Sequence, residues 1–542
     1  MNRDRRYVPT VSGTISGITQ AIHLGHAVAS MLPRSEPDYQ PPPLENTDPM
    51  EGFASGAELD NYRYQTGDVY LGDIHSDHNQ QFSAGMPAKD DRHVMMAASN
   101  AAGKGRTVII QNLLRRISGT VSLDLKGELC SITAMRRGKA ERAKGTGTSV
   151  RQFMEHDVAA LDPQGQVKGP ARCYRVRYNP MSEIDVRNEN AEAEIRKLAA
   201  ALIVPYQSDN QWISDDTAVI LAGVIFAVLV TDKDQAHHNL IYVADLLNNT
   251  FSKLIEDLFS HPDLPKEGLA KSAKNIIEEG TEDSKVAGYY KSCLTQNLIW
   301  LSDPKMRRHV ESSDVSIKKI VQTGGDVYIS IDPNYIEEFR GWLRVIVQIC
   351  MNAKIELGVY QTTPQTLFVL DEFPQLGRFL SIERNASWIR GYNCKMLYVV
   401  QYIGQLKTLY KENWEAFTAN AGAIIAFALN DAETEEYISN RMGKILAWET
   451  SYSVSDGMSG QGLQGGMNSG KTTSQAQRER AVRMPNEVHE QTARDTGRAF
   501  VIVGDGKPII IQRRNYDDIS AAVYDSPQFI AQWEQHYREL VS

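Results

Sequence analysis

Two adjacent carboxylates, Asp371 and Glu372, directly follow the apolar run 367–370. Such a run predicts a strand buried on both faces, and two neighbouring acids at its end repel each other unless a cation or a proton-transfer role compensates. At the carboxyl end of a central parallel strand, the usual compensation is Mg²⁺ together with an activated water. We therefore interpret Asp371 as the metal-binding residue and Glu372 as the catalytic residue that polarises water. The alternative is a strand whose terminal acids face solvent.

A glycine–lysine loop near Lys104 is the second candidate for chemistry. The strand-like residues 93–98 lead into this loop, and the apolar run 108–114 follows it. A strand, a tight loop and an apolar helix form the context that a phosphate-binding loop requires. Backbone N–H groups at the start of such a helix cradle phosphates, and the lysine reaches the β- and γ-phosphate oxygens. The nucleotide-binding residues predicted in this way are Ser99, Asn100, Ala101, Ala102, Gly103, Lys104, Gly105, Arg106 and Thr107.

Two positions depart from the usual phosphate-binding pattern. Ala98 stands where the first glycine usually lies, and Gly105 stands where a serine or threonine usually ligates Mg²⁺. Either Thr107 takes over as a metal ligand, or the metal is held by the phosphates, water and Asp371 alone. With either alternative, the predicted cofactors are ATP and Mg²⁺.

A second stretch, residues 465–472, fits the pattern GxxxxGK[ST] completely, with Lys471 as its lysine. No strand-like run precedes it and no apolar helix follows it. It lies within residues 451–477, which are rich in Ser, Gly, Gln and Met. Because such a composition cannot bury a core, it predicts a flexible loop. We therefore predict that this second match does not bind phosphate.

Polar residues also follow several other strand-like runs. These runs are 120–125, 158–161, 326–331, 395–400 and 423–429, with helical stretches between them. Apolar strands that alternate with helices predict an α/β fold with a parallel, doubly wound sheet and a site at one edge. Gln401 ends one of these runs, so we predict that it senses the γ-phosphate as a catalytic residue. The alternative is a polar residue that only terminates a strand.

Length and composition are those of a globular protein with more than one domain. The chain has 542 residues, of which 42% are hydrophobic and 23% charged, and its net charge is −9. An acidic chain lacks the overall basic signature of a nucleic-acid binder, so any DNA contact must be local. Five scattered cysteines without a CxxC pair predict reduced thiols and no zinc site. The longest apolar run, 218–230, is too short to span a bilayer and suits a buried helix.

Changes of composition along the chain suggest four segments. Residues 1–60 are expected to form an N-terminal arm and linker, because they are weakly patterned and rich in proline. Residues 61–182 form the first part of the nucleotide-binding domain, and residues 314–542 form its second part, including the loop at 451–477. Between them, residues 183–313 have helical spacing and few strand-like runs, which predicts an all-α domain inserted into the nucleotide-binding domain.

These motifs resemble those of the TraG-like type IV secretion coupling proteins, which are relatives of TraD and, more distantly, of the FtsK and HerA translocases. The resemblance covers residues 90–520, and a glycine after the loop lysine, here Gly105, is itself usual in that family. The matching stretches are the glycine–lysine loop, Asp124-Leu125-Lys126-Gly127-Glu128, Leu161-Asp162-Pro163, Tyr178-Asn179-Pro180, Asp371-Glu372-Phe373, Gln401, Glu433-Thr434 and Met484-Pro485-Asn486-Glu487.

The resemblance implies a RecA-like P-loop NTPase fold with a mostly parallel central sheet and an inserted all-α domain. It also implies an ATPase that forms a ring, with six subunits expected, around a DNA channel. The implied partners are DNA, a relaxase or another secreted protein, and type IV secretion components. The resembling motors carry a catalytic arginine finger just before the strand that ends in Gln401, and Arg390 matches its position. The alternative is a surface arginine that closes a helix before Gly391.

Members of the family generally begin with transmembrane helices, and the sequence shows no such segment of its own. Either a partner supplies the membrane anchor, or the protein runs as a cytosolic motor. We expect a cytoplasmic location, or a peripheral one at the inner membrane of a bacterium.

Three functions are compatible with these observations. The first is an ATP-dependent coupling protein that recruits DNA–relaxase complexes or protein substrates and translocates them to a type IV secretion channel. The second is a soluble hexameric DNA translocase without a secretion partner. The third is a substrate receptor whose ATPase fold no longer turns over, and the presence of Lys104 and Glu372 argues against it.

Overall fold

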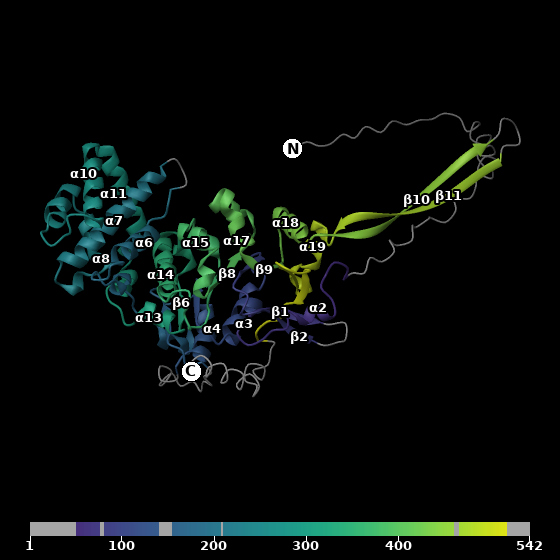
Figure 1. The fold of residues 1–542 in the computed structure, drawn as a ribbon, viewed down its shortest axis with the longest axis horizontal. Helices are drawn as coiled ribbons and strands as arrows, with labels where there is room; N and C mark the ends of the chain where they lie inside the picture. Colours follow the sequence, from purple (N-terminus) through teal and green to yellow (C-terminus); the bar gives the residue numbers. More distant parts are fainter. Residues whose placement is uncertain (1–49, 76–80, 140–153, 207–209, 460–465, 518–542) are drawn as a thin grey trace, which may run out of the picture. The chain divides into compact units, whose positions relative to one another are not determined.

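The computed structural model describes residues 50–75, 81–139, 154–206, 210–459 and 466–517. The chain divides into two compact units. The smaller one contains Leu446–Arg478, and the main unit contains Met50–Ile445 together with the residues from Glu479 onward. Each unit is described by itself below, with the element labels of Figure 1.

The main unit is built on a sheet in which 11 strands are seen among the described residues, in the order β2-β1-β13-β12-β9-β3-β8-β7-β4-β6-β5. The strands are β1 (Val69–His75), β2 (Gln81–Met86), β3 (His93–Ala98), β4 (Thr120–Leu123), β5 (Val158–Leu161), β6 (Asp326–Ile329), β7 (Thr366–Leu370), β8 (Cys394–Val400), β9 (Ala421–Phe427), β12 (Arg498–Val503) and β13 (Ile509–Gln512).

The strands from β9 to β5 in this order are all parallel. Val94 of β3 lies opposite Leu397 of β8, and Leu370 of β7 lies opposite Leu123 of β4. The remaining strands are antiparallel, including the hairpin formed by β12 and β13. The predicted mostly parallel sheet is therefore confirmed. The carboxyl ends of β3, β8, β7 and β4 lie side by side at one edge of this sheet.

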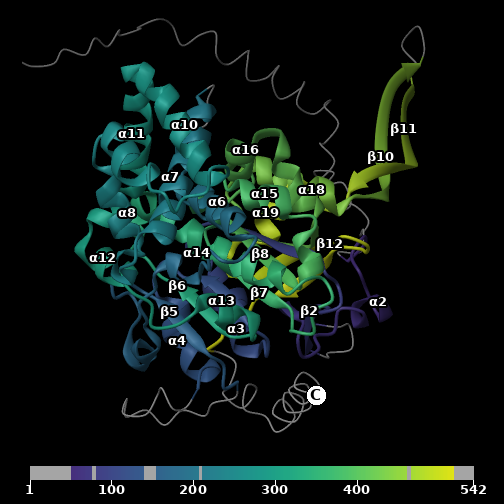
Figure 2. The same ribbon diagram turned by 60° about the vertical axis from the view of Figure 1, so that its left-hand side comes forward.

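Helices cover both faces of the sheet, as Figure 2 shows for the main unit. Along β3, Val94 and Met96 belong to one hydrophobic core, and Met95 belongs to the other. Because both faces are buried, the central strands read as continuous apolar runs rather than as alternating patterns. The helices that cover the sheet or extend it are α2 (Ala57–Asp60), α3 (Ile110–Arg115), α4 (Glu128–Arg137), α13 (Ile317–Gln322), α14 (Ile336–Glu356), α15 (Leu380–Asn385), α16 (Gly404–Tyr410), α17 (Glu415–Ala419), α18 (Ala432–Met442) and α19 (Pro485–Gln491).

A helical module lies between β5 and β6, where the described residues contain no strand. Its helices pack around α7 and are grouped together in Figure 1. The assignment of residues 183–313 as a separate domain remains a prediction, with which this helical content agrees. The helices of the module are α6 (Ala191–Leu202), α7 (Gln211–Thr231), α8 (Leu240–Leu247), α9 (Phe251–Leu254), α10 (Leu269–Glu282), α11 (Ser284–Leu298) and α12 (Pro304–Val310).

From residue 218 to residue 230, helix α7 is apolar around its whole circumference. Its best 18-residue stretch has a mean hydropathy of 2.1, and it is the one helix among the described residues that is long and apolar enough to cross a membrane. However, 67% of that stretch is buried inside the protein. Gly223 lets α10 approach closely, since a Cβ atom at this position would lie 2.2 Å from Cβ of Ala273. The predicted buried helix is confirmed, although it extends beyond the apolar run 218–230 at both ends.

The N-terminal boundary needs a correction. Most of the predicted arm, residues 1–60, lies outside the described residues. Its last part nevertheless packs onto the main unit: Phe53 is only 2% exposed, and its ring centroid lies 5.5 Å from that of Phe500. The proline-rich composition up to residue 49 gave no indication of this packing, because it is made by apolar side chains beyond that stretch, namely Phe53, Ala54 and Leu59.

The prediction of a flexible loop at 451–477 is wrong for the secondary structure of its described residues. Strands β10 (Lys444–Ser459) and β11 (Gly466–Ala481) pair as a two-stranded sheet. At the base of this ribbon, Lys444 Nζ lies 3.2 Å from a carboxylate oxygen of Glu479. The composition of the tract indicated only that it cannot bury a core. Two strands can still satisfy each other's backbone N–H and C=O groups without one.

Candidate nucleotide site

The glycine–lysine loop lies between β3 and the helix that begins at Lys104. Two of its residues have left-handed backbone angles, Ala101 with φ 56° and Gly103 with φ 87°. This conformation is unfavourable for alanine, and strained backbone of this kind is concentrated at ligand sites. The following turn, η1 (Gly105–Ile109), is a π-helix. Arg513, which directly follows β13, supports the loop, because its Nη1 donates a hydrogen bond of 2.8 Å to the carbonyl of Ala102.

Lys104 lies against the two acids at the end of β7. Its Nζ forms an ion pair with the Glu372 carboxylate and lies 4.0 Å from Oδ1 of Asp371. Glu372 also has a left-handed backbone, with φ 53°, and its N–H donates a hydrogen bond of 3.1 Å to Asp371 Oδ1. This backbone turn directs two consecutive carboxylates toward one lysine. A regular strand would point consecutive side chains to opposite faces.

Gln401 lies at the end of β8, beside these residues. Its Nε2 donates a hydrogen bond of 2.8 Å to Oε2 of Glu372, and its backbone N–H donates one of 2.9 Å to Oε1 of Gln405. The amide therefore holds one oxygen of the Glu372 carboxylate, while Lys104 binds the other. Residues from three parallel strands thus meet at one point of the sheet edge.

A cavity of about 420 Å³ opens at this point, within the size range of ligand pockets in proteins. The predicted residues that line it are Asn100, Ala101, Gly103, Lys104, Gly105, Arg106, Asp371, Glu372 and Gln401. The sequence prediction missed a further set, namely Asp124, Leu125, Lys126, Glu128, Leu129, Pro333, Ile336 and Gln375. The charged stretch that follows β4 was the available signal for most of this set, because its position at a strand end is the same as that of Asp371.

Burial raises the pKa of two carboxyl groups in this cavity. The pKa of Asp371 rises to about 6, mainly through burial, with Lys104 opposing the rise and Glu372 adding to it. The pKa of Asp124 rises to about 7, again mainly through burial, although it accepts hydrogen bonds from the backbone N–H groups of Cys130 (2.8 Å) and Leu129 (3.1 Å). Two acids whose charged forms are disfavoured, the buried Asp124 and the partly buried Asp371, are suited to a bound cation.

Three predicted nucleotide-binding residues do not line the cavity. Ser99 and Ala102 are absent from its wall among the described residues. Thr107 is buried, and its hydroxyl donates a hydrogen bond of 2.9 Å to the carbonyl of Gly103. The structure therefore does not direct Thr107 at a metal in the cavity. The reason is local, because a threonine in a helical turn can satisfy its hydroxyl on the carbonyl four residues earlier.

Arg390 lies far from the cavity of its own chain. It belongs to η9 (Ile389–Tyr392), which precedes β8, whereas Gln401 follows β8. The length of this strand separates the two residues by roughly 20 Å. Its Nε lies 3.5 Å from Oδ2 of Asp91. The alternative role for Arg390 was to close a helix before Gly391. This boundary is wrong, because η9 includes Gly391 and ends before Asn393, which has φ 55°.

The second glycine–lysine match has a different geometry. Residue 465 lies outside the described residues, and residues 466–472 form part of strand β11. An extended strand does not wrap its N–H groups around an anion as a phosphate loop does before a helix. This observation agrees with the prediction that Lys471 has no role in nucleotide binding.

Comparison with known proteins gives the family. Residues 54–536 match the model of the family described as type IV secretory system conjugative DNA transfer. The chain belongs to this family. It is 28% identical over 369 residues to protein VirD4 of Rhizobium rhizogenes, covering 67% of this chain and 51% of that protein. It is 27% identical over 373 residues to the conjugal transfer protein TraG of Escherichia coli, covering 65% and 55%. The chain thus spans about half the length of these relatives.

Solved structures of the conjugative coupling protein TrwB have the same fold. A trigonal form with sulphate gives a TM-score of 0.60 at 15% identity, covering 85% of this chain and 93% of that one. A complex of TrwB with ADP and Mg²⁺ gives 0.59 at 14% identity, covering 85% and 93%. The predicted RecA-like P-loop fold is therefore confirmed.

Proposed function

We propose that the chain is the ATP-hydrolysing motor of a type IV secretion coupling protein. The observation that carries this proposal is the convergence of Lys104, Asp371, Glu372 and Gln401 in one cavity at the carboxyl edge of a parallel sheet. A lysine, a metal-binding acid, a base and an amide sensor are the parts that phosphoryl transfer requires, because its catalysis consists mainly of positioning and charge stabilisation.

Each residue takes a role that its environment supports. Lys104 neutralises the β- and γ-phosphate oxygens of ATP, in exchange for its present pairing with Glu372. Once released from Lys104, Glu372 accepts a proton from the attacking water, and Gln401 keeps its carboxylate in place through the 2.8 Å hydrogen bond. The backbone of residues 101–106 supplies N–H groups to the phosphates at the start of the helix.

The cavity also fits Mg²⁺. When bound, the metal would neutralise charge on the phosphates during transfer. Asp371 is the residue to hold it, because burial raises the pKa of this carboxyl group to about 6 and a cation would relieve that cost. Since the Thr107 hydroxyl bonds to the Gly103 carbonyl, the proposed coordination relies on Asp371, the phosphates and water.

TrwB has been solved with ADP and Mg²⁺ and with a non-hydrolysable ATP analogue. We extend these cofactors, ATP and Mg²⁺, to this chain. We further propose DNA in the channel of a homo-oligomeric ring of six subunits, a relaxase or other secreted protein as substrate, and secretion components as partners. With this assignment, the ATPase would act at the cytoplasmic side of a bacterial inner membrane. The proposed role of the segment 183–313 is substrate selection, because it is inserted without interrupting the motor sheet.

Arg390 is proposed to act on the nucleotide of a neighbouring subunit. Its side chain is 36% exposed and is not part of the cavity of its own chain. A guanidinium supplied across a subunit interface neutralises charge that develops in the transition state. The competing role is a structural ion pair with Asp91, which joins the residues preceding β8 and β3.

ATP hydrolysis by two lysine variants tests the proposal. Lys104→Ala should abolish ATP binding and turnover, because no other lysine approaches the phosphates from the loop. Lys471→Ala is the matched control, since it removes the lysine of the other GxxxxGK[ST] match, and it should retain both. Steady-state phosphate release and fluorescent-nucleotide binding give the two readouts. Equal losses in both variants, or full activity of Lys104→Ala, would contradict the assignment.

Secretion and soluble translocation differ in their partners. Tagged protein purified from its native host should retain a relaxase or secretion components if it is a coupling protein. The alternative, a soluble translocase, would show ATPase activity that DNA stimulates, and no relaxase or secretion component would co-purify with it. The purification must use conditions under which known complexes of this kind survive.

A further inference from the structure

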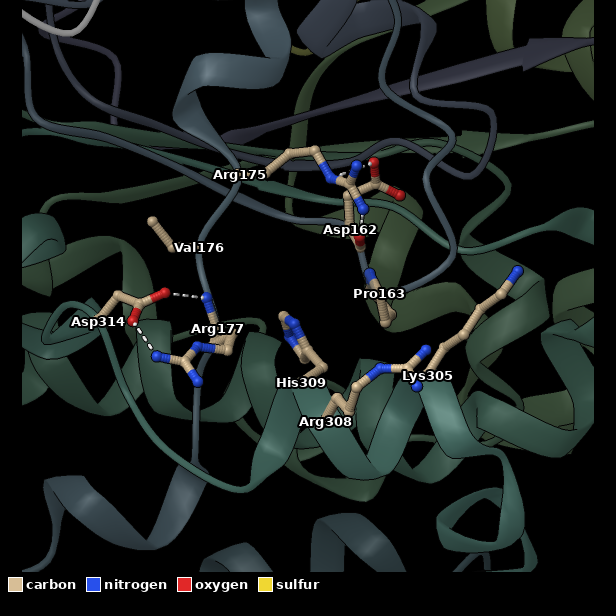
Figure 3. Close-up of a pocket in the computed structure, with 9 residues that line it drawn as sticks. All are labelled: Asp162, Pro163, Arg175, Val176, Arg177, Lys305, Arg308, His309 and Asp314. Carbon is tan, nitrogen blue, oxygen red and sulfur yellow. Dashed lines mark hydrogen bonds and ion pairs between the residues drawn. The ribbon is translucent and has the colours of Figure 1, made fainter.

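A second cavity lies where the chain leaves the sheet for the helical module and where it returns. Its volume is about 370 Å³. Figure 3 shows its wall, which combines the end of β5, the segment that follows η2 (Gly169–Tyr174), and helix α12. It shares no lining residue with the nucleotide cavity. The residues that line it are Asp162, Pro163, Arg175, Val176, Arg177, Lys305, Arg308, His309 and Asp314.

Two of the four basic residues in this wall are already paired. Arg175 Nε lies 3.2 Å from Oδ2 of Asp162, and Arg177 Nη2 lies 3.0 Å from Oδ1 of Asp314. These pairs hold the guanidinium groups at the cavity wall, as the dashed lines in Figure 3 indicate. They also cancel the charge of both acids that line the cavity.

The other two basic residues, Lys305 and Arg308, project from α12 on the same face of the helix. In the part of the chain that the structure describes, neither side chain has an ion pair or a hydrogen bond. With the two acids cancelled, the wall carries a net charge of two positive units from these residues. This is a local concentration of positive charge on a chain whose net charge is −9.

Backbone hydrogen bonds hold both sides of this cavity in place. The Asp162 carboxylate accepts bonds of 2.7–2.9 Å from the N–H groups of Gly165, Gln166 and Val167, which fixes the turn after β5. On the opposite side, the N–H of Tyr178 donates 2.9 Å to the carbonyl of His309. The backbone around the cavity is therefore fixed, so that binding would have to order only side chains.

His309 forms the floor between Arg177 and Arg308 in Figure 3. It is 5% exposed, and its ring packs edge-on against Trp342 with centroids 5.5 Å apart. Its Nε2 has no hydrogen-bond partner among the described residues. Burial, with the nearby Arg175 charge, lowers the pKa of this imidazole to about 3, so it is neutral near pH 7. An unpaired polar atom at a cavity wall costs free energy that a polar ligand would recover.

We propose that this cavity is a binding site for a phosphate monoester, held by Lys305 and Arg308 and flanked by Arg175 and Arg177. A monoester carries about −1.5 to −2 charges at pH 7, which matches two unpaired cations. A single carboxylate or a phosphodiester carries one charge and would leave one cation unmatched. The planar guanidinium of Arg308 can donate two parallel hydrogen bonds to two oxygens of a phosphate, and Lys305 adds a point charge. The ligand is inorganic phosphate, a nucleoside monophosphate, or the 5′-phosphate of a DNA strand.

Calorimetric titration of the full-length protein with inorganic phosphate tests this site. The Lys104→Ala protein is used alongside the wild type, so that binding to the glycine–lysine loop is removed. Phosphate should still bind to Lys104→Ala protein, and Lys305→Ala or Arg308→Ala introduced into it should each weaken that binding at least about tenfold. Arg307→Ala is the matched control, because Arg307 lies on the same helix but pairs with Asp245 outside the cavity. It should leave the affinity unchanged.

Charge-preserving variants and alternative ligands complete the test. Arg308→Lys keeps the charge but not the guanidinium fork, so it should retain more affinity than Arg308→Ala. A protein that loses binding through misfolding would show no such difference. Titration with AMP, and with single-stranded DNA with or without a 5′-phosphate, identifies the source of the phosphate group. The proposal is overturned if phosphate does not bind to Lys104→Ala protein, or if Arg307→Ala weakens it as much as Arg308→Ala. Binding of a glutamate-rich peptide in place of every phosphate ligand would also overturn it.

Discussion

Glu372→Gln separates the two roles that the structure gives to Glu372. The substitution keeps the size of the side chain and removes its charge and its ability to accept a proton. A general base contributes about 10²–10⁴-fold to a rate, so ATP turnover should fall by that factor. ATP binding should instead tighten, because Lys104 now pairs with Glu372 and a triphosphate must displace this pair. Breaking such a charge-assisted bond costs about 1.5–3 kcal/mol, and recovering half of it gives a threefold to roughly tenfold higher affinity.

The same variant predicts a shift with pH. The Glu372 charge helps to raise the pKa of Asp371 to about 6, so its removal should lower that pKa. Because only the ionised carboxylate binds the metal, Mg²⁺-dependent nucleotide binding is lost as the pH falls through this value, and Glu372→Gln should lose it at a lower pH than the wild type. Binding of a fluorescent nucleotide at several pH values measures the pH at which Mg²⁺-dependent binding is lost. Phosphate release near neutral pH measures the fall in ATP turnover. Glu412→Gln, at an exposed acid away from the cavity, is the control. Wild-type turnover, or weaker ATP binding, would refute this account of Glu372.

Three further predictions follow from particular contacts. Asp326→Asn should destabilise the fold by about 3–5 kcal/mol in chemical denaturation, since Arg137 pairs with Asp326 at 2.7 Å and both side chains are fully buried. Burial alone would raise the pKa of Asp326, but Arg137 and His156 hold this pKa well below its usual range. The stabilisation by this ion pair is therefore fully present above the unfolded-state pKa of Asp326 and should disappear as the pH falls toward the folded-state pKa. A difference in stability between wild type and Asp326→Asn that does not change with pH would contradict this account. Arg390→Ala should bind ATP without hydrolysing it, and mixing with Lys104→Ala protein should restore some activity; if both assemble and the mixture stays inactive, the proposed finger is wrong. Gly105→Ser should fold and retain ATPase activity, because a Cβ atom at Gly105 would meet no heavy atom within 4 Å; a collapsed thermal transition would show that this position does not tolerate a side chain.

Local sequence determined much of the sheet. The runs at 93–98 and 158–161 coincide with β3 and β5, and the acids at 371–372 follow directly on β7. These strands are buried on both faces, so each is marked by a continuous apolar run that ends at a polar residue. The glycine–lysine loop was identified for a similar reason, because its strand, loop and helix are consecutive in the chain. The predicted group of Lys104, Asp371, Glu372 and Gln401 is brought together by the structure as expected from parallel strands.

Only the tertiary structure decided which side chains face the cavity. Thr107 turns to the Gly103 carbonyl, Asp124 joins the site from β4, and Arg390 lies before β8 at the other end of the strand. The Thr107 contact is local, but the order of strands in the sheet sets the positions of Asp124 and Arg390, and that order depends on contacts between residues far apart in the sequence. The β10–β11 ribbon could not be predicted from composition either, because its two strands pair through backbone groups that every residue type carries. The basic cavity around Arg308 joins chain segments more than a hundred residues apart, so neighbouring residues in the sequence could not reveal it.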